Sequence, residues 1–167
     1  MLDAAINHED ELKMKFQSTW FSEKYKYWAY SSYYEVFEVA QNTMESHQFV
    51  SLNTEGEVIG YIGYSVYRGD DSVDGLNIIN FTDGNKATFG IDVATAVRDI
   101  FEKFHFRKLN FVVVIGNPIE KTYDHLMKKY NGRIVGTWKK HVKLYDGAIC
   151  DVKLYEILAE DYFKAVV

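Results

Sequence analysis

Side chains capable of chemistry gather at three places in this sequence. The first is Gly116-Asn117-Pro118, directly after an apolar run, where the Asn117 carboxamide suits a ligand contact and a helix cap equally well. The second is the tyrosine-rich segment from Tyr25 to Tyr34, whose rings and hydroxyl groups suit a pocket wall or, more simply, core packing. The third is the loop from Arg68 to Asp74, which attracts an amine or is merely a solvated connection. Each place therefore has a structural explanation beside the chemical one.

Several common kinds of catalytic centre have no counterpart in the sequence. The five histidines form no zinc-binding pattern, and there is no paired-cysteine spacing, Walker loop or Gly-x-Ser-x-Gly nucleophile elbow. The single cysteine, Cys150, excludes an intramolecular disulfide and fits a reducing compartment. Without a local histidine pattern, it is better explained as a strand-core thiol than as a nucleophile. We therefore expect no metal centre and no cysteine chemistry.

The composition indicates a single folded domain over residues 1–167. With 47% hydrophobic residues, 26% charged residues and one proline, the chain is not of low complexity and is long enough to bury a core. A formal net charge of −5 argues against nucleic-acid binding and would suit a cationic partner. No apolar run is long enough to span a membrane, and residues 1–10 lack the pattern of a signal peptide. We expect a cytoplasmic protein.

The most continuous apolar run, Leu109 to Ile115, predicts a central strand covered on both faces. Pro118 suits the first turn of a helix, with Asn117 before it as the N-cap, because proline lacks the amide hydrogen that a strand needs. We expect this helix to end at Asn131-Gly132, which adopt left-handed conformations readily. Its predicted apolar face comprises Ile119, Tyr123, Leu126, Met127 and Tyr130.

Strand patterns flank this unit on both sides. A hairpin is predicted from Phe49 to Asn53 and from Glu57 to Tyr67, because apolar residues alternate there with a period of two. Leu76 to Thr82 is the next expected strand, and it should lie parallel to the central one. Two closing strands, Arg133 to Leu144 and Ala148 to Leu158, are joined at a turn formed by Tyr145, Asp146 and Gly147.

Helical periodicity accounts for the remaining segments. Two helices are expected before residue 45: the first carries Leu12, Phe16 and Trp20, and the second carries Tyr25, Trp28, Tyr33, Phe37, Ala40 and Met44. A further helix, with Asp92 as its N-cap, crosses between the two parallel strands. Its apolar face comprises Val93, Val97, Ile100, Phe101 and Phe104.

These segments resemble the GNAT superfamily of acyltransferases, and most closely its ribosomal-protein N-terminal acetyltransferase branch. The resemblance covers roughly residues 47 to 160 and is specific mainly in the order of elements. It rests on Gly116-Asn117-Pro118, Tyr123-Asp124, the run from Lys128 to Gly136, Asp146-Gly147, Asp151, Lys153 and Tyr155-Glu156. The resemblance implies an α/β fold, with a mixed, mostly antiparallel sheet that contains a central parallel strand pair and is flanked by helices.

The resemblance further implies that acetyl-coenzyme A (acetyl-CoA) binds where the two parallel strands splay apart. Its pantetheine arm would meet the backbone near Asn80, Phe81 and Thr82, with Asn117 on the opposite side. Its pyrophosphate would lie at Lys86, Ala87, Thr88, Phe89 and Gly90. The family's glycine-rich loop is altered here, because Ala87 and Phe89 stand at two of its key positions and the Phe89 ring would obstruct a close backbone approach. Lys86 would meet the phosphates as a point charge, or is simply an exposed lysine.

The implied reaction is attack of a primary amine, on a small molecule or a protein, upon the acetyl thioester. Tyr123 is the candidate acid for the departing thiolate, although it is offset by one residue from the family's tyrosine and also suits core packing. The base is left open among Glu35, Glu38, Asp83, the acidic loop and a water chain. A GNAT-fold binding module without catalysis is the second hypothesis, and the aromatic closing strands leave a monomer and a homodimer both open.

Overall fold

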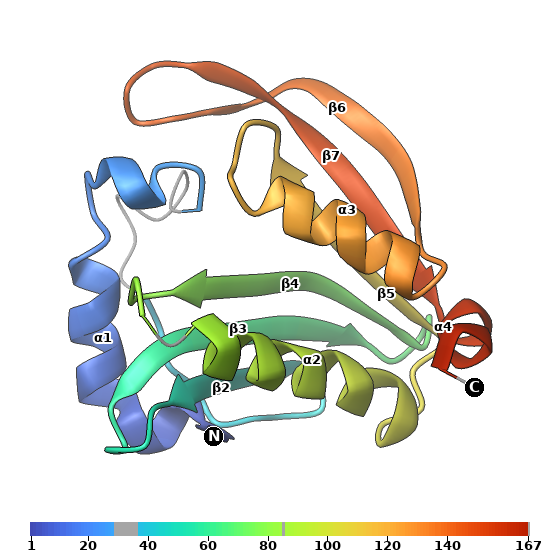
Figure 1. Ribbon diagram of the computed structural model, residues 1–167, viewed down its shortest axis with the longest axis horizontal. Helices are drawn as coiled ribbons and strands as arrows, with labels where there is room; N and C mark the ends of the chain where they lie inside the picture. Colours follow the sequence, from blue (N-terminus) through green and yellow to red (C-terminus); the bar gives the residue numbers. More distant parts are fainter. Residues whose placement is uncertain (29–36, 85, 167) are drawn as a thin grey trace.

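The computed structural model describes residues 1–28, 37–84 and 86–166, and these fold around one seven-stranded sheet (Figure 1). Along the sheet the order is β1 (Leu2–Ala4), β2 (Ser46–Leu52), β3 (Val58–Tyr67), β4 (Ser72–Asn80), β5 (Lys108–Val114), β7 (Ile149–Leu158) and β6 (Arg133–Lys143). The described α-helices are α1 (Glu9–Gln17), α2 (Lys86–Glu102), α3 (Glu120–Lys129) and α4 (Ala159–Val166), with short 3-10 helices η1 (Ala5–His8) and η2 (Glu23–Tyr25).

The expected mixed, mostly antiparallel sheet with one central parallel strand pair is confirmed. All neighbouring strands pair antiparallel except β4 and β5, which are parallel and joined through α2. Alternation along β3 separates two cores: Ile62 faces the cluster that buries α2 and α3, while Tyr61 faces the cluster that buries α1. The helices therefore cover both faces of the sheet.

The parallel pair separates soon after it begins. Only Ser72 with Lys108 and Val73 with Leu109 are paired across β4 and β5. Directly after these pairs, Gly75 and Leu76 of β4 stand opposite the single residue Tyr64 of β3, which is a β-bulge, and Gly75 has a φ of +67°. A bulge bends its strand and increases the local twist. The bend accompanies the divergence of β4 from β5, so the splay expected from the sequence is present.

The crossover helix α2 begins earlier than the sequence predicts. It starts at Lys86, and Asp92, the expected N-cap, lies inside it with only 6% of its surface exposed. There the Asp92 carboxylate accepts a hydrogen bond from the Ser51 hydroxyl at 2.6 Å. Phe89 is also buried, and its ring packs over Gly60 on β3 instead of projecting from the start of the helix. The expected obstruction of the backbone by the Phe89 ring was therefore wrong.

The N-terminal segment departs most from expectation. The structure adds β1, which pairs with β2, and confirms α1, with Leu12 and Phe16 buried. The second helix was wrong in its described parts, because only η2 is helical between Glu23 and Trp28 and residues 37–45 contain no helix. Tyr33, which the sequence placed on this helix, lies outside the described residues. The C-terminal helix α4 was also not foreseen.

The hairpin of β6 and β7 was predicted with nearly correct bounds, but its outer strand is irregular. Three residues of β6, Lys139 to His141, stand opposite Asp151 alone, and Lys140 adopts a φ of +50°. The Asp151 carboxylate holds this bulge by accepting hydrogen bonds from the Lys140 amide at 2.7 Å and the Lys139 ammonium at 2.9 Å. Beside the bulge, the rings of Trp138 and His141 lie 4.4 Å apart.

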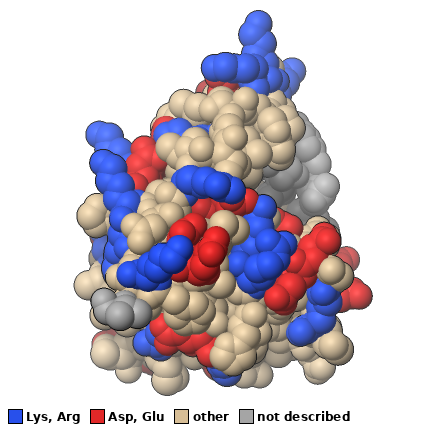
Figure 2. All heavy atoms as spheres, turned by 90° about the vertical axis from the view of Figure 1, so that its right-hand side faces the viewer, with Lys and Arg blue, Asp and Glu red and all other residues tan. Residues whose placement is uncertain are grey.

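Charges of both signs are mixed on the surface. Figure 2 shows lysine and arginine side chains interspersed with aspartate and glutamate on one side of the molecule, without a continuous basic area on that face. One ion-pair group joins three strands, because the buried Glu156 carboxylate pairs with Lys108 and with Arg133. Among the described helices, none has both the length and the apolar character needed to cross a membrane.

Candidate functional site

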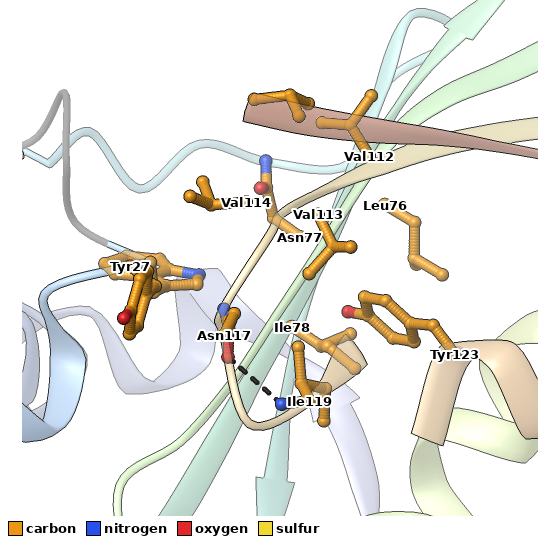
Figure 3. A pocket seen from close by; sticks show the side chains of 12 residues that line it. Tyr27, Leu76, Asn77, Ile78, Val112, Val113, Val114, Asn117, Ile119 and Tyr123 are labelled. Carbon is orange, nitrogen blue, oxygen red and sulfur yellow. Dashed lines mark hydrogen bonds between the residues drawn. The ribbon is translucent and has the colours of Figure 1, made fainter. Parts of the chain in front are cut away.

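A pocket opens where β4 and β5 separate (Figure 3). Apolar side chains of both strands and of the following turn form most of its wall, and a few polar groups reach into it. The residues that line it are Tyr27, Trp28, Leu76, Asn77, Ile78, Val112, Val113, Val114, Asn117, Ile119, Tyr123 and Val152. A concave, mainly apolar site with few polar groups is the usual form of a small-molecule site.

The edge of β4 that faces β5 carries backbone groups that no strand pairs. Phe81 donates its amide to Ile59 on β3, so the alternation of an antiparallel pair directs the backbone of Ile78 and Asn80 toward the pocket side. The Asn80 carbonyl accepts a hydrogen bond from the Tyr25 hydroxyl at 3.2 Å, and the Thr82 amide donates to the Asn80 side chain at 3.0 Å.

Each of the expected pantetheine contacts near the end of β4, Asn80, Phe81 and Thr82, thus has one backbone group already bonded within the protein. The pocket instead borders β4 four residues earlier, at Leu76, Asn77 and Ile78. The sequence placed the strand four residues too late, because β4 begins at Ser72 and not at Leu76.

The Asn117 side chain caps the turn before α3 and also lines the pocket. Its side-chain oxygen accepts a hydrogen bond from the Ile119 amide at 3.1 Å, shown dashed in Figure 3, and its carbonyl accepts one from the Glu120 amide at 2.9 Å. These bonds form a turn before α3, which itself begins at Glu120 instead of near Pro118. The amide nitrogen of Asn117 and the second lone pair of its oxygen are the groups that could meet a ligand.

Tyr123 projects from α3 with its hydroxyl toward the middle of the pocket, near Val113 (Figure 3). Its ring is buried and stands edge-on to Phe111 at 5.0 Å and to Tyr155 at 5.9 Å. Within the described part of the chain, no residue hydrogen-bonds its hydroxyl. Burial raises the pKa of Tyr123 well above its ordinary value, so the phenol stays protonated at neutral pH. The ring is structural, while the hydroxyl group remains available as a donor.

Two aromatic residues reach the pocket from the N-terminal segment, Tyr27 and Trp28. Gly116, with a φ of +99°, leaves room for Tyr27, whose hydroxyl oxygen would lie 3.2 Å from a Cβ at that position. Part of the tyrosine-rich segment therefore forms a pocket wall, which the sequence raised as a possibility after core packing. Tyr30, Tyr33 and Tyr34 lie outside the described residues.

Ion pairs and a hydrogen bond tie residues 23–26, just before these aromatics, to the protein on both sides of the pocket. Toward the end of β4, Lys24 pairs with Asp83 at 3.0 Å. Toward the β6–β7 turn, the Tyr145 hydroxyl donates to Glu23, and the Lys26 ammonium lies 3.6 Å from Asp146. The segment thus bridges the two halves of the sheet at the end where they separate.

The start of α2 is the expected pyrophosphate position. Lys86 and Ala87 are exposed there, Thr88 is half-buried, and Gly90 is exposed within the second turn. The first amides of a helix have no partner within the helix and favour anions. Lys86, Ala87, Thr88, Phe89 and Gly90 therefore present a helix start that suits phosphate, although its role in binding stays a prediction.

The residues considered as the general base lie at different places relative to the pocket. Asp71 of the acidic loop lies at the closed end of β4 and β5, where its carbonyl accepts from the Arg107 amide at 3.0 Å, whereas Asp74 belongs to β4, two residues before Leu76. Asp83 is paired with Lys24, and Glu35 lies outside the described residues. No carboxylate occurs among the described residues that line the pocket. None of the carboxylates of the acidic loop lines the pocket, and the identity of the base stays open.

A charged network lies beside Tyr123, and the sequence named Asp124, Lys153 and Tyr155 for the resemblance without predicting that they meet. Lys153 of β7 pairs with Glu120 and with Asp124, which follow each other by one turn of α3. The Tyr155 hydroxyl donates to Asp124 at 2.7 Å, and this bond lowers the pKa of the Asp124 carboxyl, assisted by Lys153. The network fixes α3 on the sheet and so fixes the ring of Tyr123.

Solved structures of acetyltransferases share this arrangement of strands and helices. A chimera of spermidine N-acetyltransferase SpeG from Vibrio cholerae and hSSAT has 20% sequence identity and a TM-score of 0.60, covering 72% of this chain and 73% of its own. A SpeG mutant from Vibrio cholerae has 19% identity and a TM-score of 0.61, covering 74% and 71%. Another SpeG structure from that organism has 20% identity and a TM-score of 0.59, covering 72% and 69%.

No protein-family model and no curated protein matches this chain in sequence. At such low identity, the solved structures bear on the fold. They do not single out the ribosomal-protein branch that the sequence suggested. The chain has the fold of the GNAT acetyltransferases, with a pocket at the point where its two parallel strands part.

Proposed function

We propose that this protein transfers an acetyl group from acetyl-CoA to a primary amine. The observation that carries the proposal is the pocket between the separated strands, which combines apolar walls with the Tyr123 hydroxyl and the Asn117 amide. An open strand edge on β4 suits the amide groups of a pantetheine arm, because an extended ligand can add to a sheet edge. The start of α2, with Lys86, suits the pyrophosphate.

The residues would divide the work of the reaction. Acetyl-CoA supplies an activated acetyl group and a thiolate leaving group. Tyr123, held protonated by burial, would donate its proton toward the departing sulfur, while Asn117 orients the arm. The amine must reach the thioester carbonyl unprotonated, and we assign its proton to water at the open end of the pocket, because no carboxylate is found among the described lining residues.

The acceptor class is supported by the neighbours in fold, whose names give spermidine as a substrate. A cationic acceptor also agrees with the net charge of −5. We therefore place small polyamines first among acceptors to test, followed by lysine derivatives and peptides with a free amino group. The ribosomal-protein branch remains a prediction from sequence that the peptide arm of this panel tests.

The test has two stages. Thermal denaturation and calorimetric titration with acetyl-CoA come first, because a ligand that binds only the native state must raise the melting temperature, and the rise grows with the logarithm of its concentration divided by its dissociation constant. Release of free thiol in the presence of each amine then reports turnover. Absence of binding at high cofactor concentration would overturn the proposal. Binding with no turnover on any amine would support the second hypothesis, a binding module with the GNAT fold.

A further inference from the structure

One polar group beside the pocket has no partner. The indole nitrogen of Trp28 is buried from solvent, and no hydrogen-bond acceptor is found for it among residues 1–28, 37–84 and 86–166. Buried polar groups in native proteins are nearly always bonded, so each exception calls for an explanation. Trp28 lines the pocket between β4 and β5, which places the exception at the proposed site.

The chemistry of indole restricts what the partner can be. Its N–H group donates and cannot accept, so it recognises an oxygen acceptor and not a protonated amine. Most of the surrounding pocket wall consists of valine, isoleucine and leucine side chains, which offer no acceptor. Tyr27, Asn77, Asn117 and Tyr123 supply the polar side chains of this wall, and none of them accepts a hydrogen bond from the indole N–H. The acceptor is therefore expected on a molecule that enters the pocket.

We propose that the Trp28 N–H donates a hydrogen bond to a carbonyl oxygen of an acyl-pantetheine arm bound between β4 and β5. This rests on the proposed function and names a residue that binds the acyl donor. The arm carries carbonyl oxygens of two kinds, amide and thioester, and both offer the acceptor that indole requires. In the thioester case the bond would also meet the oxygen on which charge develops during attack.

Contacts on several sides hold Trp28 in place beside the pocket. Its ring packs on Phe16 of α1, with the centroids 5.0 Å apart. The preceding residues are tied to the end of β4 through Lys24 and to the β6–β7 turn through Lys26. A donor fixed in this way loses little freedom when a ligand arrives, which favours binding.

The experiment compares three forms of the full chain. In the first, Trp28 is replaced by its benzothiophene isostere, which keeps the ring size and substitutes sulfur for N–H. In the second, Trp28→Phe, the indole is replaced by a natural side chain. Trp138→Phe is the matched control, because Trp138 is an exposed tryptophan on β6 outside the pocket. Calorimetry with acetyl-CoA and with desacetyl CoA gives the affinities, and melting of the free protein gives stability.

We expect the isostere to weaken acetyl-CoA binding by about five- to tenfold, the usual size for one neutral hydrogen bond. The free protein should melt no lower than the wild type, because the lost donor has no partner in it. Equal weakening for both ligands would assign an amide oxygen of the arm, and weakening for acetyl-CoA alone would assign the thioester oxygen.

Three results would overturn the Trp28 contact, and one of them would also overturn the proposed function. Wild-type affinity for both ligands in the isostere refutes the role of Trp28 and leaves the proposed function intact. A wild-type protein that binds neither ligand refutes the proposed function and the Trp28 contact with it. A drop in melting temperature of the free isostere would show that the indole N–H has a partner within the protein, which also refutes the proposal.

Discussion

The ring of Phe89 fills the space above Gly60: a Cβ at residue 60 would lie 2.2 Å from Phe89 Cε2 and 2.9 Å from the Ile79 carbonyl oxygen. The contact joins the first turns of α2 to β3. The carbonyl of Ile79 places β4 next to the same residue. The contact therefore sets where the helix starts relative to the strand whose divergence from β5 opens the pocket.

The first prediction follows from this contact. Gly60→Ala should lower the free energy of unfolding by about 1–3 kcal/mol, the usual cost of overpacking a core, because neither the ring nor the carbonyl can yield easily. Denaturant unfolding measures the change. Gly136→Ala is the control, since a Cβ there would meet nothing within 4 Å, and it should alter stability by less than about 0.5 kcal/mol. Equal effects in the two variants would contradict the assigned role of Phe89.

Gly90 allows the predicted pyrophosphate site to be tested without damage to the fold. It lies inside α2 in an exposed position, and an added Cβ would meet nothing within 4 Å. Gly90→Ala should therefore stabilise the protein by about 0.5–1 kcal/mol through helix propensity. We expect weaker CoA binding at the same time, because a methyl group hinders a close approach of phosphate. A more stable variant with unchanged affinity would remove Gly90 from the site.

Lys86 should strengthen cofactor binding through its charge. Lys86→Ala is expected to weaken CoA binding by about 1 kcal/mol, and the difference should shrink as ionic strength rises. Lys103→Ala, just beyond the opposite end of α2, is the matched control and should leave affinity unchanged. Titration calorimetry at two salt concentrations measures both effects. If the two variants behave alike, Lys86 is only a solvated lysine.

Tyr123→Phe tests the proposed acid while keeping the buried ring. Turnover on a working amine should fall by about 10²-fold, with melting temperature and cofactor affinity nearly unchanged, because no described residue bonds the hydroxyl. Tyr162→Phe is the control: its hydroxyl donates to Glu102 at 2.8 Å on α2, so it should cost stability but not turnover. Full activity in Tyr123→Phe would exclude the role.

Buried tyrosines make stability depend on pH at the alkaline end. Burial raises the pKa of Tyr61, Tyr64 and Tyr123 above the value of about 10 expected in the unfolded chain. Their protonated forms therefore favour the folded state; this contribution is complete below pH 10 and is lost as pH rises toward the folded values. Urea unfolding, followed with tyrosinate absorbance, should show the loss. Constant stability above pH 10 would contradict it.

The parts of the fold that local signals define were predictable. The apolar run before Gly116, the proline after it and the glycines at turns gave β5, α3 and the closing hairpin, since each is decided by a few neighbouring residues. The start of α2 was missed because it depends on Phe89 meeting Gly60, a contact between distant parts of the chain. The second N-terminal helix failed because Tyr27 and Trp28, in the turn after η2, pack against different clusters.

The site was predictable to a similar degree. Asn117 and Tyr123 were placed by the turn and helix that carry them, and both do line the pocket, although their chemical roles stay predictions. The polar network of Lys153 and Asp124 could have been found from their charges only with the register of β7 known. Trp28 gave no signal, because a tryptophan in an aromatic-rich segment is indistinguishable from core until its unbonded nitrogen is seen.

The bulge on β6 has a consequence for how copies of this protein meet. An outermost strand offers free amide and carbonyl groups that can template another strand, and this is a common route to aggregation. Here Lys139 to His141 break the ladder, Lys140 turns to a positive φ, and Asp151 engages its amide. The regular edge is thereby interrupted in the second half of β6, so a neighbouring chain cannot extend the sheet across it.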